Sequence, residues 1–176
     1  MSNEVNATKA NEAPTRLADG TYQPVLTVSD LDRCGRRWML GASIYNYESQ
    51  CAPAVMFATE PALRKIYAGD EEGYRRSLLS TYRYYNATPQ VSGLLLGAGL
   101  ALEDKGHNDA IDAVQDLKIG LMGSLSGVGD TIFAILIPTI FGSIAAYMGQ
   151  AGNPVGVLLW LAVAIAIFVW KLLTGA

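Results

Sequence analysis

A single carboxylate, Asp130, lies inside the glycine-rich stretch GLMGSLSGVGDTIF, at the edge of a long uncharged segment. No Asp, Glu, Lys, Arg or His occurs over residues 131–170. An ionisable group at membrane depth costs about 2.5 to 3.5 kcal/mol on insertion scales, so it normally faces a cavity or a partner. Two compatible roles follow for Asp130: contact with a ligand or partner, and capping of a helix that starts at Thr131.

Polar side chains also cluster beside aromatic residues at two earlier places. IYNYESQ carries Asn46, Glu48 and Gln50 next to two tyrosines, and YYNATP carries Asn86. Carboxamides and carboxylates hydrogen-bond vicinal hydroxyls, and aromatic faces cover the apolar face of a sugar ring. The alternative is a solvent-facing helix C-terminus at residues 46–50 and an ordinary turn before Pro89. Sugar recognition is therefore one of two open interpretations.

Glycines recur at helical spacing in the apolar half of the chain. Residues four apart lie on one helix face, and small residues there let two helices approach closely. Glycines just before a helix can also adopt unusual dihedral angles and expose amide donors. We therefore expect helix packing at Gly93, Gly97, Gly123, Gly127 and Gly129.

Other chemistries fit the sequence poorly. GSLSGVGDT lacks the Lys-Ser/Thr ending of a Walker phosphate loop and follows no predicted strand. GVGD matches the GxGD of intramembrane aspartyl proteases, but that reaction needs two carboxylates, and the apolar segments contain no second one. His107 is predicted to be a plain loop residue, and Cys34 and Cys51 to be reduced thiols. The sequence contains no nucleophile–base pair, cofactor motif or metal-ligand spacing, and the net charge of −3 provides no footprint for nucleic acid.

The elements that must position these residues differ along the chain. Residues 1–25 have few large apolar side chains and predict a mobile arm without a signal-peptide core, which favours a cytoplasmic N-terminus. Thr27 and Asp30 form a capping-box pattern at the start of an amphipathic helix suited to the membrane surface or a partner, with residues 46–50 at its end. Two helices are expected over residues 52–67 and 71–85, the first broken or entered near Pro61.

The second half is predominantly apolar. Residues 91–102 are too few for a span of about 20, which favours a re-entrant segment or a buried core helix. A polar loop leading into a short helix is expected over residues 104–118. Residues 131–170 are long enough for two crossings joined by MGQAGNP, with Pro138 breaking the first or making it re-entrant. Residues 155–173, with Trp160, Trp170 and Lys171, form the clearer transmembrane helix.

These elements predict an all-α integral membrane protein with N-terminal amphipathic and re-entrant helices and one or two transmembrane helices. The expected parts are a mobile arm at 1–25, a helical, partly cytoplasmic or interfacial region at 26–118, and a membrane region at 119–176. The alternative is a soluble all-helical protein with a very apolar core.

Several segments together resemble the enzyme IID component of the mannose-family sugar phosphotransferase system. They are LTVSDLDRCGRRWMLGASIYNYESQ, PALRKIY, YYNATP, LGAGLALE and LKIGLMGSLSGVGD, followed by the hydrophobic region. They occur in the family's order and cover nearly everything from Leu26 onward. The resemblance implies a subunit of the bacterial cell membrane that pairs with an enzyme IIC subunit to form the sugar path. Phosphoryl groups would reach the sugar through histidines on separate cytoplasmic IIA and IIB proteins.

The resemblance also implies a hetero-oligomer with several copies of each membrane subunit in the lipid bilayer. Its expected function is translocation of a hexose or amino sugar together with IIC, dependent on phosphoenolpyruvate and coupled to phosphorylation by IIB. The subunit itself would hold no cofactor and no catalytic residue. The polar residues expected near the sugar or the IIC interface are Asn46, Glu48, Gln50, Asn86 and Asp130. The alternative is a non-transporting membrane adaptor or a truncated partner-binding subunit.

Three features depart from the family pattern. Thr88 precedes Pro89 where family members often carry His or Asn, so the sugar preference or local contacts are expected to differ. Ser124 follows GLMG where Pro is common. The chain is also shorter than the family's chains, as a fragment, a split subunit or a shortened relative would be.

Overall fold

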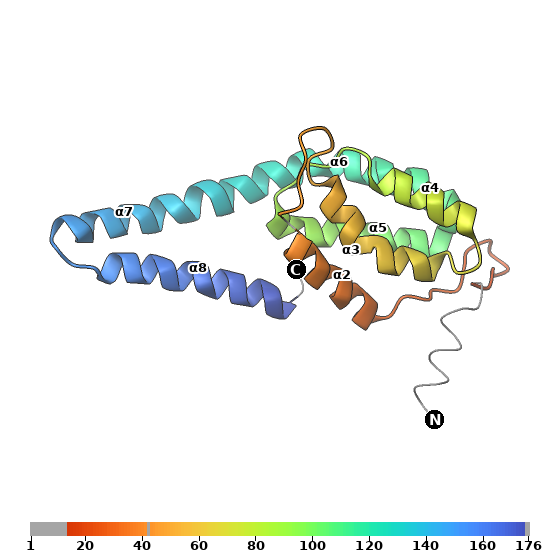
Figure 1. Ribbon diagram of the computed structural model, residues 1–176, viewed down its shortest axis with the longest axis horizontal. Helices are drawn as coiled ribbons and strands as arrows, with labels where there is room; N and C mark the ends of the chain where they lie inside the picture. The colour runs from red at the N-terminus through yellow and green to blue at the C-terminus, as the bar shows by residue number, and fades with distance from the viewer. Residues whose placement is uncertain (1–13, 42, 175–176) are drawn as a thin grey trace, which may run out of the picture.

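A computed structural model describes residues 14–41 and 43–174, and their regular structure is helical apart from isolated β-bridges. Figure 1 shows two parts: a cluster formed by α2 to α5 with the start of α6, and a long hairpin in which α7 and α8 extend away from it. The predicted all-α fold is confirmed. Asp130 lies in the helical run that connects the two parts.

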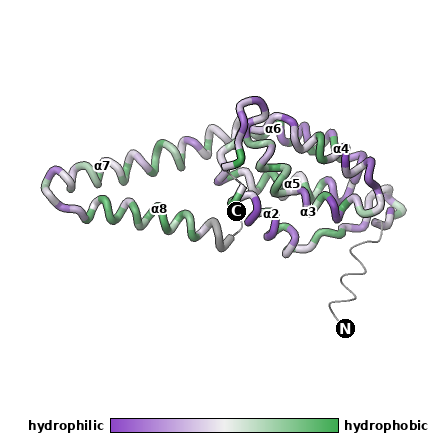
Figure 2. The backbone as a smooth tube through the Cα atoms, viewed as in Figure 1, coloured by the Kyte–Doolittle hydropathy of each residue, from purple (hydrophilic) through white to green (hydrophobic). Residues whose placement is uncertain are grey.

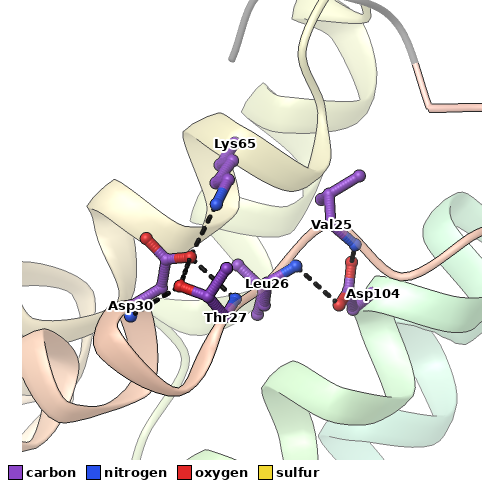
Figure 3. Close-up of polar contacts among 6 residues, drawn as sticks. All are labelled: Val25, Leu26, Thr27, Asp30, Lys65 and Asp104. Carbon is purple, nitrogen blue, oxygen red and sulfur yellow. Dashed lines mark hydrogen bonds and ion pairs between the residues drawn. The ribbon is translucent and has the colours of Figure 1, made fainter. Parts of the chain in front are cut away.

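The capping box at the start of helix α2 (Val28–Gly41) is confirmed. The Thr27 amide donates to Asp30 Oδ2 at 2.8 Å, and the Asp30 amide donates to Thr27 Oγ1 at 3.3 Å (Figure 3). These bonds satisfy amide donors that a helix start leaves free. Cys34 and Trp38 face inward, and the Trp38 indole donates to the Pro89 carbonyl at 2.9 Å, tying α2 to the start of α5.

Helix α3 (Ala52–Ile66) continues through Pro61 without the predicted break. A proline lacks the amide that would bond the carbonyl four residues earlier, here that of Phe57. Arg37 of α2 replaces that donor, since its Nε bonds the Phe57 carbonyl at 2.7 Å and its guanidinium lies 4.1 Å from the centre of the Phe57 ring. A contact between two helices therefore allows a proline that local rules predict to interrupt the helix.

Helix α4 (Glu71–Thr81) begins at an Asp70 cap, whose carboxylate accepts the Gly73 amide at 2.9 Å. The prediction that it continues to Tyr85 is wrong: it ends at Thr81, and residues 82–88 form a non-helical segment that begins with a turn at Tyr82. Tyr85 is wholly buried there. Packing of this tyrosine in the core, rather than helix propensity, determines where α4 stops.

Helix α5 (Pro89–Gly106) packs in the cluster with one face buried, as expected for a core helix. Its inward face contains Ser92, Leu95, Leu96, Gly99 and Leu100, all buried by neighbouring helices of the cluster. The residues that follow form a 3-10 turn (His107–Ala110) instead of the predicted polar loop.

His107 is not a plain loop residue, because it is 4% exposed and has a positive φ of 46°. Its ring stacks at 3.9 Å between centroids against Tyr22 and meets Tyr67 edge-on at 5.3 Å. Tyr22 belongs to a segment far away in sequence, which local pattern could not reveal. Its aromatic contacts identify His107 as part of the packed core.

Residues 14–26, the end of the predicted arm, lie along the end of α5. The Tyr22 amide donates to the Lys105 carbonyl at 2.8 Å, and the amides of Val25 and Leu26 donate to the buried Asp104 carboxylate at 2.9 and 3.1 Å (Figure 3). Asp104 thereby receives the donors that a buried carboxylate requires. Residues 1–13 of the arm lie outside the described residues.

Helix α6 (Ile111–Gly129) is longer than the short helix predicted and runs without interruption through a π-helical segment (Asp130–Leu136) into α7 (Ile137–Gln150). No helix starts at Thr131, so the capping role predicted for Asp130 is wrong: its backbone is helical on both sides. Pro138 does not break the crossing. The wider π turns directly precede it, as they often do where a regular hydrogen bond is lost.

Helix α8 (Val155–Thr174) returns along α7 after a turn in which Asn153 Oδ1 accepts the Val155 amide at 3.0 Å. A Cβ at Gly156 would lie 2.9 Å from Ala145 Cα, so glycine permits the close approach of the two helices. The hairpin is strongly hydrophobic in Figure 2, and many of its large apolar side chains are exposed. Within the helical residues Pro89–Gln150 there is a stretch long and apolar enough to cross a membrane, and Val155–Trp170 forms a shorter apolar helix. The side chain of Lys171 lies outside the described residues.

Candidate functional site

The polar residues 46–50 form a tight turn beyond α2 and not the end of that helix. Asn46 Oδ1 accepts the Ser49 amide at 2.7 Å and the Ser49 hydroxyl at 3.0 Å, an arrangement typical of Asn in turns. Gln50 closes the turn by exchanging backbone hydrogen bonds with Asn46, at a positive φ of 57°. The Tyr45 hydroxyl donates to the Gln50 carboxamide, while Glu48 is exposed. Hydrogen bonds within the turn hold its shape, and Glu48 leaves its outer edge polar.

Residues 82–88 connect this turn to the rest of the site. The Tyr85 carbonyl accepts the Cys51 amide at 2.8 Å, and the Tyr85 amide donates to the Ser49 carbonyl at 3.3 Å. The Asn46 side-chain amide donates to the Tyr82 hydroxyl at 3.3 Å. These hydrogen bonds therefore connect the turn at residues 46–50 to residues 82–88, which are distant in sequence. Asn86 lies in this segment with its side chain exposed.

Thr88, at the other end of residues 82–88, contacts Asp130. The Thr88 hydroxyl lies 2.6 Å from Asp130 Oδ1 and 3.1 Å from the Ser126 carbonyl, and the Ser126 hydroxyl donates to Asp130 Oδ2 at 3.2 Å. Asp130 nevertheless remains exposed, and a carboxylate can accept more than two hydrogen bonds. We call Thr88, Ser126 and Asp130 the polar joint, because they connect the helical cluster to the apolar hairpin.

Gly129 makes the joint possible. A Cβ at this position would lie 2.5 Å from Thr88 Cβ and 2.6 Å from its hydroxyl oxygen. At Gly97, Gly123 and Gly127, by contrast, an added Cβ meets nothing within 4 Å in the described chain. Gly93 lies with Gly97 along a mainly apolar cleft between α2 and α5. Of Gly97, Gly123, Gly127 and Gly129, Gly129 is the one at which an added Cβ would meet the described chain.

The structure thus brings all three predicted groups together through residues 82–88. It adds three residues that we did not predict as part of the site: Tyr82, Thr88 and Ser126. Thr88 was noted only as a departure from a family pattern. Ser126 lies four residues before Asp130 on a helix, a spacing that would have revealed it had the continuous helix been predicted.

The chemistry available here is binding by hydrogen bonds. The groups at hand are carboxylates, carboxamides, hydroxyls and tyrosine rings, which suit a polyhydroxylated ligand. Burial raises the pKa of Tyr85 to about 12, so its phenol stays neutral at physiological pH. Cys34 and Cys51 are free thiols, and burial raises the pKa of both, so neither is activated as a nucleophile. Among the described residues, no three His, Cys, Asp or Glu side chains cluster so as to hold a metal ion.

The fold and this site define an all-helical membrane component with a cluster of polar residues at the base of an apolar hairpin. A family model described as the mannose/fructose/sorbose family IID component of the phosphotransferase system matches residues 25–175. The chain belongs to this family. It is therefore a IID membrane component of a sugar phosphotransferase system of the mannose family, and the cell membrane is its location.

Individual relatives agree with this assignment. The mannose-specific EIID component of Escherichia coli K12 is 34% identical over 143 residues, covering 80% of this chain and 50% of that protein. The fructose permease IID component of Bacillus subtilis is 31% identical over 126 residues, covering 70% of this chain and 45% of that protein. The chain thus spans about half the length of the curated relatives it matches.

The fold is also similar to a solved structure. A chain in the cryo-EM structure of the mannose transporter ManYZ with microcin E492 matches with a TM-score of 0.70 and 30% identity. The match covers 87% of this chain and 58% of that one. The similarity extends through most of the described residues and therefore includes both the helical cluster and the apolar part.

Proposed function

We propose that the chain is the IID part of a sugar translocation unit, acting with an enzyme IIC subunit. A hexose or amino sugar would cross the membrane along a path shared by the two subunits and be phosphorylated by IIB at the cytoplasmic side, with phosphoenolpyruvate as the ultimate donor and IIA as a carrier. The cytoplasmic phosphoryl carriers and the IIC subunit are the partners proposed, in a hetero-oligomer with several copies of each membrane subunit.

One observation supports this proposal most strongly: the polar joint lies where the helical run passes from the cluster into the exposed apolar hairpin. Asp130 is exposed there even though Thr88 and Ser126 hydrogen-bond it. A carboxylate at such a boundary is retained at a cost, which a ligand or partner that uses it would explain. Asn86 lies two residues before Thr88, and its exposed side chain could bind the same ligand.

The turn at residues 46–50 would complete the polar surface. Asn46 and Gln50 are held by neighbouring tyrosines, whereas the Glu48 side chain is exposed for contact with sugar hydroxyls or with IIC. The open glycine faces at Gly97, Gly123 and Gly127 would suit close approach of IIC helices, since nothing in this chain fills the space beside them. In this arrangement the N-terminus and the helical cluster would face the cytoplasm.

Uptake measured in cells that produce the chain with its IIC, IIB and IIA partners tests the proposal. Replacing Asp130 by Ala should abolish phosphoenolpyruvate-dependent uptake while the subunit remains in the membrane. Asp112→Ala is the matched control, because Asp112 is an exposed aspartate on the same helix, remote in sequence from the joint. Normal uptake by the Asp130 variant contradicts the proposal. A complete complex that assembles but never transports sugar would identify the chain as an adaptor instead.

A further inference from the structure

A buried lysine on α6 is absent from the site described above yet contacts the segment that builds it. Lys118 is 4% exposed, and its ammonium donates to the carbonyl of Thr81 at 3.1 Å. Thr81 is the last residue of α4, where helix carbonyls lack internal partners and the helix dipole is negative. The lysine therefore caps α4 at the point where residues 82–88 begin.

The same ammonium lies near the centre of that segment. Lys118 Nζ is 5.6 Å from the centre of the Tyr85 ring, within the range of a cation–π interaction. Tyr85 is wholly buried, and its backbone pairs with Ser49 and Cys51 of the polar turn. One side chain thus contacts the residue just before 82–88 and lies near the ring in the middle of that segment, whose last residue, Thr88, belongs to the polar joint.

The burial of this charge requires compensation. Glu103 of α5 is 3% exposed and lines the same small cavity as Lys118, and it also accepts the Tyr67 hydroxyl at 2.8 Å. The opposite charges of Lys118 and Glu103 attract each other across the cavity, which offsets part of the cost of burying them. An apolar residue could fill this space at lower cost. The ammonium instead bonds the end of α4 and lies near Tyr85, which links it to residues 82–88.

We propose that Lys118 is a positioning residue for sugar recognition: it holds residues 82–88 so that Asn86 and the Thr88–Asp130 pair meet the substrate. This inference rests on the proposed function. Lys118 itself does not touch the sugar in this scheme. Its loss should therefore weaken sugar binding more than it slows the maximal rate of transport.

Two measurements on the complete transporter test the proposal. In uptake assays, Lys118→Met should raise KM for the sugar about tenfold or more, because residues 82–88 would spend less time in the binding-competent arrangement, with the maximal rate nearly unchanged. Lys118→Arg keeps the charge and donor and should restore KM towards the wild-type value. Lys105→Met, which removes an exposed lysine on α5, is the control and should leave KM unchanged.

The second measurement does not depend on transport. Cys51 is buried and its amide bonds Tyr85, so release of residues 82–88 should expose its thiol. In a Cys34→Ala background, Lys118→Met should increase the rate of maleimide labelling about tenfold, while Lys105→Met should not. If Lys118→Met does not accumulate in the membrane, Lys118→Met with Glu103→Gln removes both buried charges and is measured in its place.

Unchanged KM and unchanged labelling in a variant present at wild-type levels would overturn the proposal. A lower maximal rate at constant KM would also overturn it, because that pattern is expected when the amount or stability of the protein is reduced. If labelling rises but the wild-type chain supports no sugar uptake with its partners, the proposed function fails while the positioning of residues 82–88 by Lys118 stands.

Discussion

The helical cluster and the apolar hairpin differ in how their polar groups are paired and in which side chains they expose. In the cluster, charged side chains are buried and receive partners from distant segments, as Asp104 does from Val25 and Leu26. In the hairpin, the described helices expose large apolar side chains, and backbone polar groups are satisfied within each helix. The cluster is therefore suited to water and the hairpin to lipid. The candidate site lies where they meet.

The largest effect expected from this contrast is on membrane insertion. Leu161 of α8 and Leu79 of α4 are similarly exposed, at 55% and 59%, but lie in the two different regions. Leu161→Arg should sharply reduce the protein recovered in the membrane, because a central arginine costs about 2.5 to 3.5 kcal/mol on insertion scales. Leu79→Arg should be tolerated, since its side chain would face water.

Membrane fractionation with quantitative immunoblotting measures both variants. Equal recovery of the two arginine variants would show that the hairpin and the cluster do not differ in their surroundings. Loss of the Leu79 variant alone would reverse the contrast drawn between them.

A smaller effect is expected at the joint between the regions. Gly129→Ala places a Cβ 2.5 Å from Thr88 Cβ, whereas Gly127→Ala meets nothing within 4 Å in the described chain. The first variant should lose about 1 to 3 kcal/mol of stability through overpacking. The second should be neutral or gain up to about 1 kcal/mol, because alanine favours helix over glycine.

Thermal unfolding of the purified protein in detergent compares the two alanine variants. A Gly129→Ala protein as stable as the wild type would contradict the close contact between α6 and Thr88. Similar losses in both variants would attribute the effect to the helix as a whole and not to the joint.

The smallest effect concerns pH and the cluster alone. Burial would raise the pKa of Asp30, but hydrogen bonds from Lys65 and Thr27 outweigh it and hold the pKa below the ordinary value (Figure 3). A carboxylate with a lowered pKa stabilises the folded state at neutral pH, and that contribution disappears as the pH falls below about 4. Because the ion pair is partly exposed, the loss should be under about 1 kcal/mol.

Asp30→Asn should therefore be slightly less stable than the wild type at pH 7 and equal to it at the acid end. Unfolding midpoints in urea at both pH values measure the difference. A constant difference across that range would mean that the charge of Asp30 does not contribute.

Local signals in the sequence predicted the local features of this fold. The capping box at Thr27 and Asp30 and the two exposed apolar arms needed only spacing and composition. Contacts between distant segments decided the rest. Arg37 permits helix α3 to pass Pro61, and the core position of Tyr85 ends helix α4 early.

The site shows the same division. The residue types at Asn46, Gln50 and Asp130 indicated polar recognition, but not that residues 82–88 would join them. The glycines around Asp130 suggested the start of a helix. In the structure, the lack of a side chain at Gly129 instead allows Thr88 to approach a continuous helix. Lys118 gave no signal at all, because its partners at Thr81 and Tyr85 belong to other elements.

The central claim is that the polar joint contacts sugar, and equilibrium binding tests it most directly. Titration calorimetry of the purified IIC–IID complex with its transported sugar would compare wild type with Asp130→Asn, which keeps the shape of the side chain but removes its charge. We expect a Kd at least about tenfold higher for Asp130→Asn, as for a lost hydrogen bond to a charged group. The Kd of Asp112→Asn should be unchanged. An unchanged Kd in a correctly assembled Asp130→Asn complex would contradict the central claim.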